Sequence, residues 1–324
     1  MKRFKNILYL NESSVDQTSA LERAVSLAQN NQANLTVVDV IPPPPFPVGI
    51  GLFPGDLPVD EQPGTEESDR RAMLESMLGP YSERLKIRIE VLVGRVYLEA
   101  IGAVLKNGYD LLIKPAENPS WTNRLFGSDD LHLLRKCPCP VWLIRMPEKP
   151  LYSTILAAVD FDLYTPNPAE QELNREVLSL AASLALSDFA SLHIVHAWEA
   201  LGKKSITSRG GVSPSGLTNY VEREYERHKG EFLRLLEQLR GWMGDEGYEY
   251  LSPSLHLPQG SAKKAIPEVA ATLRADIVVM GTVARTGISG LFIGNTAETI
   301  LDQLTCSVLA IKPPGFVTPV HVDR

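Results

Sequence analysis

The sequence predicts an α/β protein that contains two copies of one domain, each with a parallel sheet covered by helices. Three observations support this prediction. Short apolar runs alternate with amphipathic helical patterns along the chain, which is typical of parallel sheets with both faces covered. The segment Phe126–Arg145, FGSDDLHLLRKCPCPVWLIR, repeats as Ile293–Lys312, IGNTAETILDQLTCSVLAIK. The length of 324 residues suits two domains better than one.

The net charge, the apolar runs and the cysteine count argue against several classes of protein. The formal net charge of -7 argues against a nucleic-acid or anionic-membrane partner, which would need a basic face. No apolar run approaches the ~20 residues of a membrane helix, and the run Ile7–Leu10 is too short for a signal peptide. Three cysteines without CxxC spacing suit a reducing compartment. We therefore expect a cytoplasmic protein with no nucleic-acid or membrane partner.

The first copy begins with a buried strand at Ile7–Leu10 and alternates regularly from there. Its first helix shows apolar residues at the i, i+3, i+4, i+7 spacing of an amphipathic helix. The run Ile41–Pro63 is rich in proline and predicts a surface loop. The expected elements are a helix stripe at Leu21, Ala24, Val25 and Ala28, a strand Leu35–Val40, a helix Asp69–Leu78, a strand Lys86–Val93, a helix with Leu98, Ile101 and Leu105 on one face, and a strand Asp110–Lys114.

The second copy follows the same order with different insertions. Asn167-Pro168 predicts a helix start, with a capping residue before a proline in the first helical position. His193 and His196 lie three apart on one strand, so they face opposite sides and cannot share a metal. The other expected elements are a helix stripe at Leu173, Val177, Leu180 and Leu184, strands Ile155–Ala158, Leu192–Ala197, Leu251–Leu257 and Asp276–Met280, a long helix Asn219–Trp242 with a solvated charged face, and a helix around Val269 with a late start or kink at Pro267.

The stretch Gly281–Glu298, GTVARTGISGLFIGNTAE, has the strongest functional pattern. It places a glycine-rich loop between a buried strand and a helix. Asn295 and Glu298 have the spacing of a capping box. Free backbone N–H groups at such a helix start favour an anion. Short glycine patterns are also common in plain connections, so the loop alone leaves both readings open.

The whole stretch through Lys312 resembles the C-terminal signature of the universal stress protein family. Gly281, Arg285-Thr286-Gly287, Gly294, Ala297-Glu298 and the strand Ser307–Ile311 carry the resemblance. Ala284 replaces a glycine and Asn295 a Ser/Thr of that signature. The resemblance implies two tandem Rossmann-like domains, at residues 1–146 and 151–314, each a five-stranded parallel sheet of strand order 3-2-1-4-5 with helices on both faces.

The resemblance also implies which residues would hold an adenine nucleotide, ATP or AMP, in the C-terminal copy only. Asp160 would accept a ribose hydroxyl, although a turn-capping aspartate is an equal alternative. The first copy aligns Lys114 with Gly281, has no glycine from Lys114 to Ser120, and carries Asp129 and Asp130 where phosphate would bind. The implied nucleotide-binding residues are Ala158, Val159, Asp160, Ala197, Met280, Gly281, Ala284, Arg285, Gly294, Asn295 and Thr296.

Several function classes stay open. The family implies a stress-response protein that acts as a ligand-binding or regulatory module. A nucleotide-independent interaction or small-molecule-binding protein is the alternative, and a slow ATP hydrolase is a weaker one. No catalytic or metal-binding residues are predicted; Cys137 and Cys139 share a strand face but lack further ligands, so buried structural thiols are expected. We expect the last strands, Val141–Arg145 and Val308–Lys312, to pair within one chain, and a further homodimer stays open.

Overall fold

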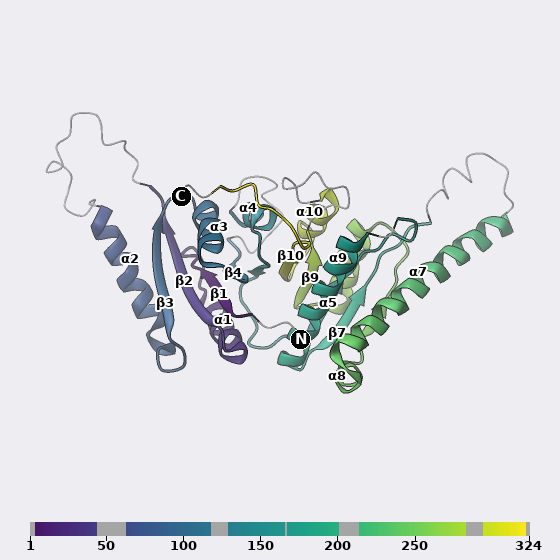
Figure 1. The fold of residues 1–324 in the computed structure, drawn as a ribbon, viewed down its shortest axis with the longest axis horizontal. Helices are drawn as coiled ribbons and strands as arrows, with labels where there is room; N and C mark the ends of the chain where they lie inside the picture. Colours follow the sequence, from purple (N-terminus) through teal and green to yellow (C-terminus); the bar gives the residue numbers. More distant parts are fainter. Residues whose placement is uncertain are drawn as a thin grey trace, which may run out of the picture.

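The computed structural model describes residues 4–43, 63–117, 129–165, 167–200, 214–282 and 294–321. Most of the proline-rich run and the central part of the glycine-rich loop therefore lie outside the described residues. The two copies stand side by side and share one sheet (Figure 1). No helix within the described ranges is long and apolar enough to cross a membrane.

The strands form one ten-stranded sheet of order β3-β2-β1-β4-β5-β10-β9-β6-β7-β8. Neighbouring strands are parallel within each copy. Both halves thus have the order 3-2-1-4-5, which confirms the predicted topology. The strands are β1 (Asn6–Leu10), β2 (Asn34–Ile41), β3 (Ile87–Val93), β4 (Leu111–Pro115), β5 (Val141–Ile144), β6 (Thr154–Ala158), β7 (Ser191–Val195), β8 (Ser254–His256), β9 (Ile277–Gly281) and β10 (Ser307–Ile311).

The two halves join through an antiparallel pair, β5 with β10, as the sequence predicted. Trp142 lies opposite Leu309, and Val141 opposite Ala310. All residues of both strands are buried. The pair removes two sheet edges that would otherwise expose unpaired backbone groups.

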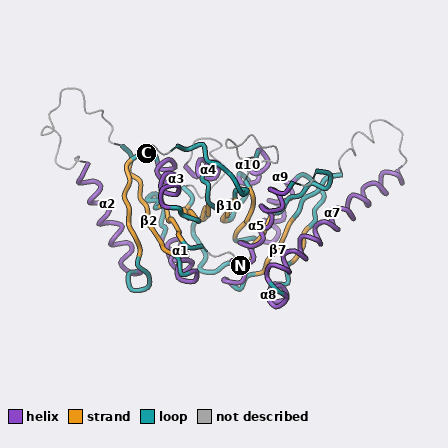
Figure 2. The backbone as a smooth tube through the Cα atoms, in the orientation of Figure 1, coloured by secondary structure: helices purple, strands orange, loops and turns teal. Residues whose placement is uncertain are grey.

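Helices cover both faces of this sheet, and the hydrophobic core of each face runs through both copies (Figure 2). One face carries α1, α2, α5, α7 and α8, and the other α3, α4, α9 and α10. The helices are α1 (Thr18–Asn31), α2 (Pro63–Leu78), α3 (Val96–Asn107), α4 (Asp129–Lys136), α5 (Pro168–Asp188), α7 (Pro214–Met243), α8 (Asp245–Leu251), α9 (Ala262–Leu273) and α10 (Asn295–Leu301), with a short 3-10 turn, η2 (Gly79–Tyr81).

Local signals correctly predicted the start of α5 and failed at the start of β8. Asn167 caps α5, because its side chain accepts a hydrogen bond from Ala169 N at 2.9 Å. The expected strand Leu251–Leu257 is wrong at its start: Leu251 ends α8, and only Ser254–His256 pair as β8. Gly244, at φ 79°, ends α7 and lets the chain turn directly into this extra helix.

Pro267 neither delays α9 nor ends it, so the expected late start is wrong. The helix begins at Ala262 and continues through Pro267 to Leu273. A proline at this position removes the backbone donor to the carbonyl four residues earlier. Gln303 supplies a replacement, since its side-chain Nε2 donates to the Lys263 carbonyl at 3.0 Å.

A buried arginine ties the two copies together beside the linker. Arg23 of α1 is 6% exposed and forms ion pairs with Glu148 of the linker and Asp188 of α5. Its guanidinium also donates to the Pro150 carbonyl at 2.9 Å and lies 3.6 Å from the Tyr152 ring centroid. Burial raises the pKa of the Glu148 carboxyl to about 7. A charge in such a place is tolerated only while its partners remain.

We expect Arg23→Leu to lower the free energy of unfolding by about 3–5 kcal/mol, because it leaves buried carboxylates without their cation. Arg84→Ala is the control. Arg84 forms an ion pair with Glu22 of α1, the helix that carries Arg23, but the Arg84 side chain is 39% exposed. Loss of that exposed pair should cost less than about 1 kcal/mol. Urea denaturation of both variants measures the difference, and equal losses would contradict the role given to Arg23.

Candidate ligand-binding site

A cavity of about 910 Å³ opens in the C-terminal copy, where β6, β7 and β9 end. Ligands of open parallel sheets commonly bind at this end of the strands. Nine of the predicted residues line the cavity, whereas Ala284 and Arg285 lie outside the described residues. The nine are Ala158, Val159, Asp160, Ala197, Met280, Gly281, Gly294, Asn295 and Thr296.

The sheet register brings the first wall of the cavity together. Ala158 pairs with Met280 and with Val195, so the ends of three strands lie at one level. A side chain at Gly281 would place its Cβ 2.6 Å from Leu173 of α5. Glycine therefore leaves room for the Leu173 side chain against the end of β9.

The two flanks of the glycine-rich loop are anchored to each other and to β10. Gly294 N donates to the Thr282 carbonyl at 3.1 Å, and Thr282 N donates to the Ile311 carbonyl at 3.1 Å. The buried Lys312 ammonium donates to the Thr282 hydroxyl at 2.6 Å. It also donates to the Leu134 carbonyl of the first copy, and burial lowers its pKa to about 7.

The loop after β6 is fixed by an asparagine of α5. Asp160 N donates to Asn174 Oδ1 at 3.2 Å, and Asn174 Nδ2 returns a bond to the Asp160 carbonyl at 2.6 Å. Asn174 is only 5% exposed. These backbone bonds hold Asp160 at the cavity wall.

The predicted capping box at the start of α10 is wrong. Gly294, not Asn295, is the N-cap, and no side chain caps the helix. Glu298 instead forms an ion pair with Arg135 of α4, across the boundary between the copies. Arg135 lies far from Glu298 in the sequence, so a rule based on the spacing of nearby residues cannot predict this ion pair.

Sequence reasoning missed a ring-lined wall of the cavity. Phe161 stacks on His196 with ring centroids 3.7 Å apart, and His196 Nε2 lies 3.0 Å from His228 Nδ1. Trp198 lies beside His228, with a centroid distance of 5.5 Å. All four residues line the cavity.

Helix α7 supplies part of this wall. Some of its charged side chains are therefore buried, and not all of them lie on the solvated face that the sequence predicts. Glu224 is 1% exposed and accepts a hydrogen bond from the Tyr164 hydroxyl at 2.6 Å. His228 and Phe232 are also buried. The spacing of Glu224, His228 and Phe232, each four residues apart, places them on one helix face and was the available signal.

The other histidine of β7 is outside this wall. His193 points to the opposite face from His196, as predicted, and its Nδ1 lies 3.0 Å from His256 Nε2. Cys137 and Cys139 are buried, with their sulfur atoms 3.5 Å apart. Among the described residues, no group of three or more His, Cys, Asp or Glu is placed to hold a metal ion.

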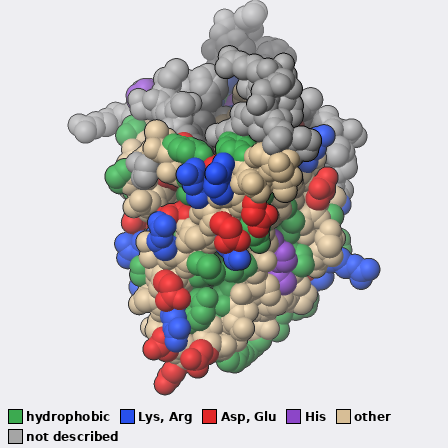
Figure 3. All heavy atoms as spheres, turned by 90° about the vertical axis from the view of Figure 1, so that its right-hand side faces the viewer, with side chains coloured by type: hydrophobic (Ala, Val, Ile, Leu, Met, Phe, Trp, Pro, Cys, Tyr) green, Lys and Arg blue, Asp and Glu red, His purple; other side chains and the backbone are tan. Residues whose placement is uncertain are grey.

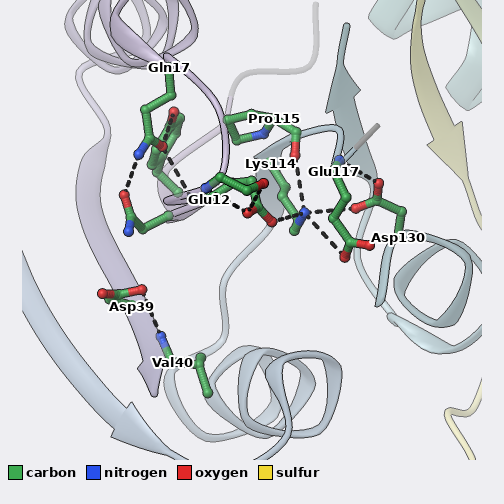
Figure 4. A network of polar contacts seen from close by, with 11 residues as sticks. Glu12, Gln17, Asp39, Val40, Lys114, Pro115, Glu117 and Asp130 are labelled. Carbon is green, nitrogen blue, oxygen red and sulfur yellow. Dashed lines mark hydrogen bonds and ion pairs between the residues drawn. The ribbon is translucent and has the colours of Figure 1, made fainter. Parts of the chain in front are cut away.

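In the first copy, a buried lysine network fills the corresponding end of β4 (Figure 4). Lys114 is fully buried, and its Nζ lies 2.9 Å from a carboxylate oxygen of Glu12 and 2.9 Å from one of Asp130. Glu117 is a third partner at 3.5 Å. Burial, followed by the nearby Asp130, raises the pKa of Glu117 to about 6.

The sheet register corrects the alignment of this lysine. Tyr9 pairs with Ile113 in the first copy, and Ala157 with Val279 in the second. Lys114 therefore corresponds to Met280, and Pro115 takes the place of Gly281. Counting residues back along the loop had matched Lys114 with Gly281, which is wrong by one residue. Strand pairing, and not the number of residues in the loop, sets which residues of the two copies correspond.

We expect Lys114→Met to lower the free energy of unfolding by about 3–5 kcal/mol at pH 8 and by less at pH 5. Without the ammonium, the folded-state pKa values of the three carboxyls rise above their unfolded values. Folding then takes up protons, so stability falls as pH rises through that window.

Chemical denaturation at both pH values measures this difference. The control is Lys149→Met, because Lys149 pairs with Asp276 but its side chain is 60% exposed. If Lys114→Met lowered the free energy of unfolding equally at both pH values, the role given to the buried carboxylates would be contradicted.

Comparison with known proteins agrees with the fold. The model of the universal stress protein family matches residues 3–145 and again residues 151–312. The chain is 30% identical to universal stress protein E of Escherichia coli K12, covering 100% of this chain and 98% of that protein. It is 28% identical to the universal stress protein E homolog of Haemophilus influenzae, covering 96% and 98%.

Solved structures show the same tandem arrangement. A functionally unknown protein from Pseudomonas aeruginosa PAO1 has a TM-score of 0.64 and 26% identity, covering 96% of this chain and 93% of that one. A universal stress protein from Archaeoglobus fulgidus has the same fold, with a TM-score of 0.62 at 17% identity, covering 96% and 97%. The chain therefore belongs to the universal stress protein family and carries two tandem domains of that family.

Proposed function

We propose that this chain is a stress-response binding module whose C-terminal copy holds a small molecule, whereas its N-terminal copy stabilises the fold. The cavity of about 910 Å³ supports this proposal most directly, because nine residues predicted from the family signature line it together. Its volume lies in the range of small-molecule sites. Binding without turnover is proposed, with a slow ATP hydrolase as the weaker alternative.

The contrast between the two copies supports the same division of roles. Lys114 and its carboxylate partners occupy the N-terminal copy at the level where Met280 borders the cavity. Asp130 lies in the first turn of α4, where a carboxylate repels phosphate. We propose that residues 1–146 bind no adenine nucleotide. Residues 1–146 and 151–314 are the proposed limits of the two domains.

Adenine-nucleotide binding in the C-terminal copy is proposed to be weak. Ala284 replaces a glycine of the family signature, and alanine costs about 1–2 kcal/mol where the backbone needs a positive φ. Asn295 lacks the hydroxyl of Ser or Thr that could donate to a phosphate oxygen. The cytoplasm is the proposed location.

We expect the full chain to bind one small molecule and to lose it in Ala197→Phe, because a phenyl ring would project into the cavity. Val40→Phe is the matched control: by strand register, Val40 is the first-copy counterpart of Ala197. Mass spectrometry of the molecules retained by purified protein measures the loss. Equal retention in both variants would overturn the proposed site.

The double change Ala284→Gly with Asn295→Ser should strengthen ATP binding, measured by calorimetry on the full chain. It restores the glycine and the hydroxyl of the family signature. Tight ATP binding by the unchanged protein, or no gain in the double variant, would contradict this account of the loop.

A further inference from the structure

We propose that the outer edge of β3 is an interface for a second copy of this chain, and that the two β3 strands pair antiparallel about a twofold axis at Ile89. This pairing would join two ten-stranded sheets end to end. The inference does not depend on the ligand-binding function, because no residue of β3 lines the cavity.

β3 is the longer of the two strands that end the sheet. It pairs with β2 over seven consecutive residues without a bulge, whereas β8 at the other end has three residues. Among the described residues, no strand lies along the outer side of either. Every residue of β3 is exposed or half-buried, and Val93 is 49% exposed. A long, regular edge is a template for another strand, and proteins usually blunt such edges with short strands, bulges or prolines.

The backbone groups of alternate residues of β3 point away from β2. Gly94, directly after the strand, donates its N–H to the Ile41 carbonyl of β2 at 3.0 Å. Because successive residues of a strand direct these groups to opposite sides, those of Ile89 and of the residues two positions away point outward. The Ile89 carbonyl agrees with this, since it accepts a long bond of 3.5 Å from the exposed Arg71 side chain. The N–H of a second strand can replace that bond.

The side chains of β3 are self-complementary in one antiparallel register. With the axis at Ile89, Arg88 lies opposite Glu90 of the partner subunit, and Ile87 lies opposite Val91 of the partner subunit. Arg88 and Glu90 share one face of the strand, because they are two residues apart. Directly opposite side chains of an antiparallel pair lie close together, so the twofold axis creates two ion pairs.

The same charges disfavour the neighbouring registers. Moving the axis by one residue would place Arg88 opposite Arg88 of the partner subunit, or Glu90 opposite Glu90 of the partner subunit, and like charges in these positions repel. Such repulsion selects a register as effectively as attraction does. Within one chain, Arg88 Nη1 lies 3.9 Å from Glu90 Oε1 and the Arg88 side chain is 68% exposed, so exchanging this pair for intersubunit pairs costs little.

The chain itself contains one contact of the same kind. β5 and β10 pair antiparallel, and the hydrophobic cores on both faces of the sheet continue across that junction. Antiparallel pairing of two strand edges is therefore compatible with helices on both faces of this sheet.

The other end of the sheet provides less for a second copy to bind. Figure 3 shows acidic and basic side chains interspersed over the end of the molecule that carries α7. Some of these charges form ion pairs along α7 itself, such as Lys229 with Glu226 at 3.4 Å and Arg227 with Glu224 at 2.9 Å. The adjacent edge strand, β8, is also too short for more than a few intersubunit bonds. The edge of β3 is therefore the better interface.

Analytical ultracentrifugation of the full chain over a wide range of concentration tests the interface. We expect a reversible dimer, which either Arg88→Glu or Glu90→Arg weakens about tenfold or more, because each change creates two like-charged pairs. The double variant Arg88→Glu with Glu90→Arg should restore the dimer, since it exchanges the two charges and keeps them complementary.

Mixing the two single variants tests the register. The Arg88→Glu strand carries two carboxylates and the Glu90→Arg strand two guanidinium groups, so every charge in a mixed dimer again faces an opposite one. We expect the equimolar mixture to associate although each variant alone does not, which also shows that both variants fold. Lys229→Glu is the matched control: it changes the net charge as Arg88→Glu does and disrupts an exposed pair on α7, so it should leave the dimer unchanged.

Four outcomes would overturn the inference. The first is a chain that stays monomeric at every concentration, and the second is a dimer that both single variants leave intact. The third is a dimer that both single variants abolish and that neither the mixture nor the double variant restores. The fourth is an equal loss in Lys229→Glu, because association would then follow net charge and not β3. Retention of a small molecule, tested with Ala197→Phe, decides the ligand-binding function separately.

Discussion

The antiparallel pairing of β5 with β10 is the constraint on which the rest of the structure depends. Each copy alone would end its sheet in an apolar edge, and pairing satisfies both edges at once. The continuous sheet then lets both hydrophobic cores extend through the two copies. Arg23 fixes the arrangement beside the linker, since its partners Glu148 and Asp188 come from the linker and the second copy. One chain thereby forms the pseudo-symmetric pair of domains.

Pseudo-symmetry of the backbone does not extend to the chemistry at the ends of the strands. In the first copy, Lys114 brings an internal cation to its own carboxylates, and this buried network stabilises the fold. In the second copy, Met280 takes the equivalent place and a cavity opens beside it. The copies also touch through Arg135 and Glu298, so the helix that follows the glycine-rich loop is held by the first copy. The two domains thus differ in the side chains at the ends of their strands while sharing one framework.

The sequence predicted those features that local patterns and repetition determine. Strand order, the two copies, the cap at Asn167 and the paired last strands all followed from periodicity, turn residues or the family signature. The failures share another cause: partners distant in the sequence. Glu298 bonds to Arg135 rather than to its own helix, Gln303 compensates for Pro267, and the charged helix α7 turns Glu224 and His228 inward. Tertiary contacts override local preference in each case.

The most direct test of the central claim is hydrogen–deuterium exchange of the full chain with and without saturating AMP. The account predicts that protection appears only in the C-terminal copy, at residues 158–164, 196–199 and 294–297, which line the cavity. Residues 10–17 and 111–117, at the corresponding end of the first copy, should exchange unchanged. Protection of the first copy's segments, with none around the cavity, would contradict the division of roles between the two copies.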